Sequence, residues 1–216
     1  LMQQLDRVGF GSLPIVALTG LFTGLVFSMN TLNALIELQA EGMVAPSMTL
    51  SLSRELGPIL TALLVAGRSG SAVSTELGTM RVTEQIDALS TLATNPYKYL
   101  VAPRLLAGMV MLPCCVLVAD IIGVFGGYLV SVHKLGFNPS VYLHRTWEFL
   151  QPLDVFSGLT KAAVFGFIIS LMGCYHGYHS RGGAQGVGAA TTNAVVSASI
   201  LILAANYVIT ELFFAI

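Results

Sequence analysis

Arg54 and Glu55 are the residues whose types and position best suit ligand binding in this chain. They interrupt a long apolar stretch, because residues 42–53 before them and 56–67 after them carry no charge. A helix needs about 20 residues to cross a bilayer core of about 30 Å, which is more than either flank supplies alone. A span over residues 45–75 therefore places both charged side chains inside the membrane.

Charged residues at this depth need partners. A charged side chain at the centre of a lipid-facing helix costs about 2.5–3.5 kcal/mol, so such residues face a bundle interior or a wet cavity. Adjacent helical residues point about 100° apart, so Arg54 and Glu55 do not form a good pair with each other. We favour a polar site for a charged lipid headgroup inside an apolar cavity. The alternatives are a structural ion pair to another helix, or a later start of the span that leaves both residues at the interface.

Residues 80–94 predict a short amphipathic helix outside the membrane. Its apolar residues recur at spacings of four, three and four, namely Val82, Ile86, Leu89 and Ala93. Pro96 ends the segment. A helix that lies on a membrane surface carries Lys and Arg on its polar face, whereas this face is acidic beyond Arg81. We therefore predict that it docks onto a protein partner.

Five short motifs in this region resemble the MlaE (YrbE) family of permeases. They are Arg54-Glu55-Leu56-Gly57-Pro58, Ala66-Gly67-Arg68-Ser69-Gly70, Glu76-Leu77-Gly78-Thr79-Met80, Glu84-Gln85-Ile86-Asp87-Ala88-Leu89 and Pro103-Arg104. Members of the family are the membrane subunits of ABC transporters that move phospholipids or other lipids. The motifs follow one another in the family's order, and the other spans fit the family in number and length.

The resemblance implies three partners besides the membrane and its phospholipids. These are a second copy of the chain in a homodimer, a separate cytoplasmic ABC ATPase, and a periplasmic lipid-binding MCE-domain protein. The acidic helix would be the coupling helix, with ATPase-coupling residues Arg81, Glu84, Gln85, Asp87, Ala88 and Leu89. The partner ATPase would bind ATP and magnesium, so that this chain needs no cofactor of its own.

The composition predicts an all-α integral membrane protein with a single permease domain over residues 1–216. Hydrophobic residues make up 55% of the chain and charged residues 10%, with a mean hydropathy of +0.78, against about 25% charged residues in a soluble domain. The net charge of -1 predicts no nucleic-acid surface. Cys114, Cys115 and Cys174 lie in apolar runs without metal-ligand spacing, so we expect buried thiols.

Hydropathy predicts five transmembrane helices, at residues 14–36, 45–75, 105–132, 153–175 and 187–214. Residues 1–13 predict an interfacial helix, and a short polar turn covers residues 37–46. A short periplasmic helix is expected within residues 133–152, where aromatic residues favour the membrane interface. Because the chain opens on Leu1 rather than Met, we expect further residues before it. Small residues recur every fourth position in each span, which is typical of closely packed membrane helices.

The distribution of basic residues predicts the orientation. If the N-terminus is cytoplasmic, five basic residues fall in inner segments and two in outer loops, which agrees with the positive-inside rule. The inner residues are Arg7, Arg81, Lys98, Arg104 and Arg181, and the outer ones are Lys134 and Arg145. We therefore predict a cytoplasmic N-terminus. The resemblance to the MlaE family implies a multi-pass protein of the bacterial inner membrane, with a plastid envelope as the alternative.

We predict a lipid-binding cavity between the first, second and fifth spans. Its residues are Phe27, Met29, Asn30, Asn33, Arg54, Glu55, Leu56 and Asn206. Arg54 would bind the headgroup phosphate through charge-assisted hydrogen bonds. Acyl chains would lie against Phe27, Met29 and Leu56.

Asp120 and Lys161 also lie within predicted spans. We favour a helix-packing hydrogen bond for Asp120, with Lys161, Arg54 or another polar side chain, over a proton relay, and we expect Lys161 to snorkel toward the interface. The alternative function is an ion-coupled secondary transporter that uses Arg54, Glu55 and Asp120. Such a transporter is expected to show internal repeats with discontinuous helices, and no repeat is found at matched positions. A purely structural scaffold would leave the Arg54 and Glu55 pair unused.

Enzymatic chemistry finds no support in the sequence. His176 and His179 are spaced for a metal, but no third ligand follows them, so we predict no metal site. The chain carries no HExxH, GxSxG or P-loop motif. We therefore predict a non-catalytic membrane subunit, with ATP hydrolysis carried out by a partner.

Overall fold

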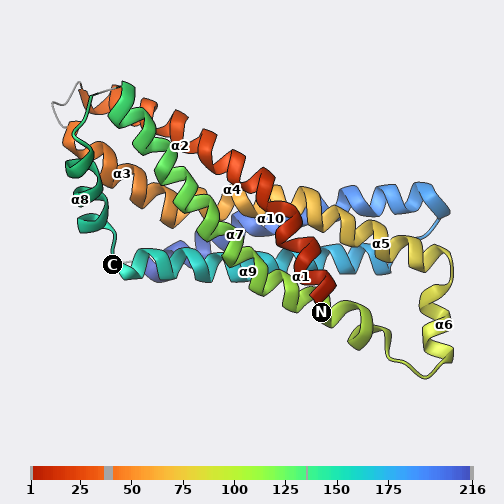
Figure 1. Cartoon of the computed structure of the whole chain (residues 1–216). Coiled ribbons are helices and arrows are strands. Elements are labelled where there is room, and N and C mark those ends of the chain that lie inside the picture. Colours follow the sequence, from red (N-terminus) through yellow and green to blue (C-terminus); the bar gives the residue numbers. More distant parts are fainter. Residues whose placement is uncertain (1, 37–40, 135, 215–216) are drawn as a thin grey trace. The chain divides into compact units, whose positions relative to one another are not determined.

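The architecture is helical throughout the described part of the chain. A computed structural model describes residues 2–36, 41–134 and 136–214, and no strand occurs within these ranges (Figure 1). Five helical segments are long and apolar enough to cross a membrane: Met2–Leu35, Val44–Val82, Tyr97–Lys134, Pro152–Tyr178 and Gly183–Phe214. The prediction of an all-α membrane protein with five spanning helices is confirmed.

The first two spans are built from several short elements each. The first contains α1 (Met2–Val8), a 3₁₀ turn η1 (Phe10–Ser12) and α2 (Leu13–Ile36). The second contains α3 (Val44–Ser51), the π-helix η3 (Leu52–Leu56), α4 (Gly57–Val65), the π-helix η4 (Ala66–Gly70) and α5 (Ser71–Val82). Arg54 and Arg68 therefore each lie in a π-helical turn. Residues 37–40 of the predicted polar turn lie outside the described residues, and the turn ends with η2 (Glu41–Met43).

The remaining elements follow the predicted order. They are α6 (Gln85–Thr91), η5 (Tyr97–Val101), α7 (Ala102–Leu129), η6 (Val130–Lys134), α8 (Pro139–Phe149), α9 (Pro152–Tyr178) and α10 (Gly183–Phe214). The predicted short helix after the third span is α8. Asn138 caps it by accepting a hydrogen bond from the Ser140 backbone N–H, and Pro139 occupies its first turn, where no N–H donor is needed.

The amphipathic helix differs from its prediction over residues 80–94. Residues 80–82 continue α5, and Glu84 adopts a left-handed backbone conformation with φ 60° that turns the chain before α6 begins at Gln85. Ala93, with φ 55°, lies beyond the end of α6. The helical spacing of the apolar residues does not by itself reveal this break. The turn brings Ile86 onto buried residues of its own chain.

Contacts divide the chain into two units, which are described separately. The first unit comprises Leu1–Ser12, Ala62–Cys114 and Lys161–Ile216, and the second comprises Leu13–Thr61 and Cys115–Thr160. In the first unit α10 packs along α5, and in the second unit α3 packs against α2 and α8 (Figure 1). Tyr142 of α8 is buried and donates to Met48 Sδ at 3.5 Å, and this burial raises the pKa of Tyr142 to about 12.

Glycines allow close backbone contact within each unit. In the first unit, a Cβ added at Gly166 of α9 would overlap the carbonyl oxygen of Gly108 on α7. In the second unit, a Cβ at Gly24 of α2 would overlap the carbonyl oxygen of Gly123 on α7. Small residues that permit such approach are a main source of helix association in lipid. Cys115 and Cys174 are buried as predicted, but Cys114 is exposed.

The contact between Gly166 and Gly108 gives a test of this packing. We expect Gly166→Ala to lower stability by about 1–3 kcal/mol, because the added methyl group must displace a backbone carbonyl. Gly188→Ala is the matched control, since nothing in the chain lies within 4 Å of a Cβ at that helical position. The control should raise stability by about 0.4–1 kcal/mol. Thermal denaturation of the purified protein in detergent measures both, and an equal effect of the two changes would contradict the packing argument.

Candidate functional site

Arg54 forms an ion pair with Asp154 at the start of α9, within the second unit. Arg54 Nη2 and Nε lie 2.6 and 2.7 Å from Asp154 Oδ1. Asp154 Oδ2 accepts a further hydrogen bond of 3.0 Å from the Gln151 backbone N–H. The Asp154 side chain is fully buried, whereas that of Arg54 is 35% exposed. The carboxylate is therefore held in place, and the Arg54 side chain stays partly exposed.

The backbone around Arg54 is irregular for a physical reason. Arg54 lies in the π-helix η3, and the backbone N–H of Gly57 closes this turn on the Leu52 carbonyl. Pro58 follows and has no N–H to donate to the carbonyl four residues before it, which is that of Arg54. The Ser53 carbonyl packs directly against Gly158 of α9, where a Cβ would overlap it. π-Helical turns are frequent at functional sites.

The other predicted lipid-binding residues lie on three elements. Glu55 and Leu56 are half-buried on the same π-helix as Arg54. On α2, Phe27 is half-buried and Met29, Asn30 and Asn33 are exposed, with Met29 Sδ 3.7 Å from Lys134 Nζ. Asn206 lies on α10, in the first unit. A cavity shared by all of these residues stays a prediction.

Two predictions about intramembrane charges are wrong. Lys161 does not snorkel: its side chain is completely buried, and Nζ donates to Thr210 Oγ1 at 2.7 Å. The Thr210 hydroxyl in turn donates to the Asn206 backbone carbonyl at 2.8 Å. Asp120 does not make a helix-packing hydrogen bond, since its buried Oδ1 has no partner among the described residues.

Two of the sequence motifs meet in an ion-pair network of the first unit. Glu76 Oε1 lies 2.9 Å from Arg7 Nη1, and Glu76 Oε2 lies 3.0 Å from Arg104 Nη2. The Arg104 side chain is only 5% exposed, and its Nη1 also donates to the Leu100 carbonyl at 2.6 Å. One carboxylate on α5 thus binds guanidinium groups from α1 and α7. Sequence analysis had placed Glu76 and Arg104 in motifs without assigning a contact to either.

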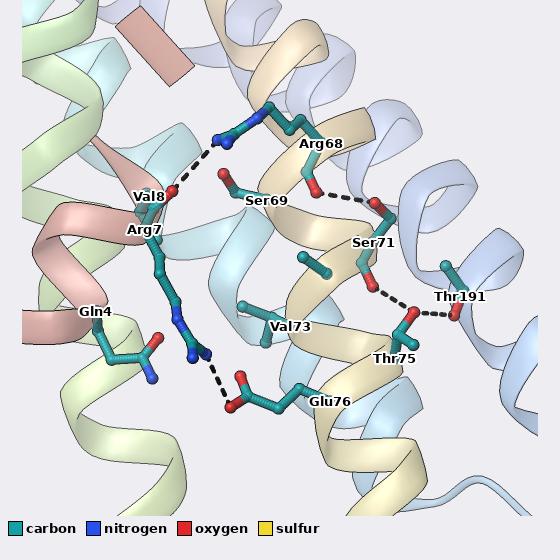
Figure 2. Close-up of a pocket in the computed structure, with 11 residues that line it drawn as sticks. Gln4, Arg7, Val8, Arg68, Ser69, Ser71, Val73, Thr75, Glu76 and Thr191 are labelled. Carbon is teal, nitrogen blue, oxygen red and sulfur yellow. Dashed lines mark hydrogen bonds and ion pairs between the residues drawn. The ribbon is translucent and has the colours of Figure 1, made fainter. Parts of the chain in front are cut away.

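A pocket of about 660 Å³ lies beside this network. Figure 2 shows Arg7 and Arg68 spanning it between α1 and the second span, with Gln4 and Glu76 on its wall. Arg68 Nη1 donates to Ser12 Oγ at 2.9 Å and to the Arg7 carbonyl at 3.3 Å. These bonds tie the start of the chain to η4. We interpret the contacts around the pocket as a structural connection between α1 and α5.

The predicted coupling residues lie in α6 or just before it. Ile86 is 1% exposed and belongs to a buried cluster with Val73, Leu77, Leu100 and Cys174, and Leu89 packs partly against it. Arg81 Nη1 lies 2.6 Å from Asp87 Oδ1. Glu84, Gln85, Asp87 and Ala88 are exposed. The apolar face that we expected to need a partner is therefore largely covered by the chain itself, while the polar face stays open.

Comparison with known proteins decides the family. The model of the family described as Permease MlaE matches residues 1–212. The chain belongs to this family. A protein of Rickettsia prowazekii described as "Probable ABC transporter permease protein" is 55% identical over 216 residues, which is 100% of this chain and 83% of the relative. This MlaE-family chain is therefore an ABC transporter permease with five apolar spans.

Two more distant relatives of this MlaE-family permease carry further names. The intermembrane phospholipid transport system permease protein MlaE of Haemophilus influenzae is 35% identical, over 99% of this chain and 82% of the relative. The chloroplastic protein TRIGALACTOSYLDIACYLGLYCEROL 1 of Arabidopsis thaliana is 38% identical, over 99% of this chain and 61% of the relative. Membership of an ABC transporter family favours our main prediction over the ion-coupled secondary transporter.

The Glu76 network predicts a stability effect in this MlaE-family permease. We expect Glu76→Gln to lower the free energy of unfolding by about 1–3 kcal/mol, because it leaves the buried Arg104 guanidinium without its carboxylate. Asp6→Asn is the matched control, since it removes an exposed carboxylate from α1. Chemical denaturation followed by circular dichroism compares the two variants. A change at Glu76 no larger than that at Asp6 would show that the network does not stabilise the fold.

Proposed function

We propose that this permease moves phospholipids between the bacterial inner membrane and a periplasmic MCE-domain carrier, driven by a separate cytoplasmic ATPase. The observation that carries the proposal is the partly exposed Arg54 side chain, which lies inside a membrane-spanning segment and is held by the buried Asp154. The name of the Haemophilus influenzae relative, an intermembrane phospholipid transport system permease protein, supports the choice of cargo.

Arg54 suits the phosphate of a lipid headgroup. A guanidinium offers several N–H donors in a planar fork, which matches phosphate oxygens and forms strong charge-assisted hydrogen bonds. Asp154 fixes the orientation of this fork. In the proposed homodimer, Glu55, Asn30, Asn33 and Asn206 would add polar contacts. Acyl chains would lie against Phe27, Met29 and Leu56.

The segment around α6 suits transmission of force from the ATPase. Its exposed residues Glu84, Gln85, Asp87 and Ala88 offer a docking surface, while the buried Ile86 anchors the helix to its own chain. The ion pair of Arg81 with Asp87 links α6 to the end of α5. A push on α6 would therefore move α5, which is continuous with the second span. ATP and magnesium would bind the partner, so the chain itself holds no cofactor.

The role of Arg54 can be separated from the stability of its ion pair. We expect Arg54→Gln to abolish lipid transfer and to lower stability, because it leaves a buried carboxylate unpaired, which costs about 3–5 kcal/mol. The double variant Arg54→Gln/Asp154→Asn replaces the ion pair by two neutral amides. It should regain most of the stability and still fail to transfer lipid. The measurements are thermal denaturation and transfer of labelled phospholipid from proteoliposomes that contain the whole complex.

Asp154→Asn alone is the matched control, because it keeps the Arg54 guanidinium. We expect it to retain part of the transfer activity. If the double variant regained transfer together with stability, the ion pair would be purely structural and Arg54 would not bind the headgroup.

The coupling surface predicts a second functional effect. We expect Ala88→Trp to weaken association with the ATPase, because the large ring projects from the exposed face of α6 without disturbing Ile86 or Asp87. Ala88→Ser, which adds little volume at the same position, should behave as the wild type. Co-purification and lipid-stimulated ATP hydrolysis measure the effect. An ATPase that binds Ala88→Trp normally and is stimulated normally would remove α6 from the coupling role.

A further inference from the structure

Asp120 of α7 is a half-buried residue that the proposed transport mechanism does not use. Its Oδ1 is buried and accepts no hydrogen bond from the described residues. The same oxygen lies so close to Gly57 that a Cβ at that position would collide with it. An unpaired ionised carboxylate in a low-dielectric interior is strongly unfavourable, so such a group needs a proton or a cation. The described residues therefore leave room for Asp120 Oδ1 beside Gly57 but supply no hydrogen-bond donor to it.

Asp120 also lines a cavity of about 230 Å³ in the second unit. The rest of the lining is largely apolar, from α7, α8 and α9. Three residues that carry hydroxyl groups complete it, Thr49, Ser53 and Thr146. Each hydroxyl donates its single proton to a carbonyl of its own helix, at 2.9 Å in all three cases. Their remaining lone pairs can only accept hydrogen bonds.

The hydroxyl-bearing residues of the lining can therefore accept hydrogen bonds, and the carboxylate of Asp120 supplies negative charge. Phosphate, itself an acceptor with negative charge, does not fit such a lining. A group that carries several N–H donors and a positive charge complements it. We propose that the cavity binds a primary ammonium group, with Asp120 as its counter-ion and the hydroxyls of Thr49, Ser53 and Thr146 as acceptors.

Trp147 gives the cavity a second cation-binding feature and indicates where the cavity lies relative to the membrane. Its ring lines the cavity, and the residue is 74% exposed on α8. The face of an indole ring attracts cations, and tryptophan favours the membrane interface. Asp120 lies in the second half of α7, within a membrane-spanning segment. The ammonium group can thus come from the headgroup of an aminophospholipid, or from a soluble amine that reaches the interface.

Trp147 is also the single tryptophan of the chain, so it reports on the cavity directly. The experiment places the whole transporter complex in nanodiscs of phosphatidylethanolamine or phosphatidylcholine mixed with the same anionic lipid. The spectrum of the Trp147→Phe complex is subtracted to isolate the signal of Trp147. We expect a shift of emission with the ethanolamine lipid and none with the choline lipid, whose quaternary nitrogen has no N–H donor. Apart from the Trp147→Phe reference, this comparison needs no variant of the cavity.

A second arm distinguishes the two sources of the amine. Ethanolamine is titrated into phosphatidylcholine nanodiscs at constant ionic strength, with choline as the control. The same shift with soluble ethanolamine would support the ammonium site with a soluble ligand, and a shift confined to the lipid would support a headgroup site. Equal responses to ethanolamine and choline, or no response in either arm, would overturn the proposal.

The variants test Asp120 itself. We expect Asp120→Asn to weaken the ethanolamine response at least about tenfold, because it removes a charge-assisted hydrogen bond. Glu148→Gln is the matched control, since it removes an exposed carboxylate beside Trp147 on the same helix. Its response should equal that of the wild type. A response retained in Asp120→Asn, or lost equally in both variants, would show that Asp120 is not the counter-ion.

Discussion

The cost of placing charge in a membrane governs this structure. A charged group in a spanning helix needs a partner, a wet cavity or access to the interface, because hydrocarbon does not solvate charge. Arg54 meets this requirement through Asp154, and Lys161 meets it through the hydroxyl of Thr210. Each contact joins two residues that are far apart in the sequence. The few charged residues of the spans therefore help to determine which helices come together, although apolar residues dominate the composition.

Backbone irregularity is the second means by which the second span positions its charges. Two of its three arginines, Arg54 and Arg68, lie in π-helical turns, η3 and η4. Each of these two residues makes a contact that a regular helix would arrange differently. Arg54 reaches α9, and Arg68 reaches Ser12 and the Arg7 carbonyl. A π turn shifts the side chains beyond it around the helix axis, so one inserted residue changes which face a charge occupies. The span can thus serve a site in each unit.

The sequence predicts the spans well because hydropathy and helix length are local properties. It predicts that Arg54 is buried and needs a partner, but not that the partner is Asp154. Many polar residues satisfy that need, and only tertiary packing selects one of them. The same limit explains the errors at Lys161, which appears suited to snorkelling until Thr210 is placed beside it, and at residues 80–94. There the apolar period is correct at Ile86 and Leu89, yet the left-handed turn at Glu84 depends on the buried cluster that receives Ile86.

Arg54 and Asp120 show how one physical constraint can produce two different sites. The guanidinium of Arg54 is neutralised within the chain and the Arg54 side chain stays partly exposed, which suits a ligand that brings negative charge. The carboxylate of Asp120 is placed against Gly57. Thr49 and Ser53 line the same cavity, and their hydroxyls already donate hydrogen bonds to backbone carbonyls. This arrangement suits a ligand that brings positive charge and N–H donors. A zwitterionic headgroup carries both kinds of group. Binding of the two charges at separate sites would let the permease distinguish lipid headgroups, while its apolar surfaces accept any acyl chain.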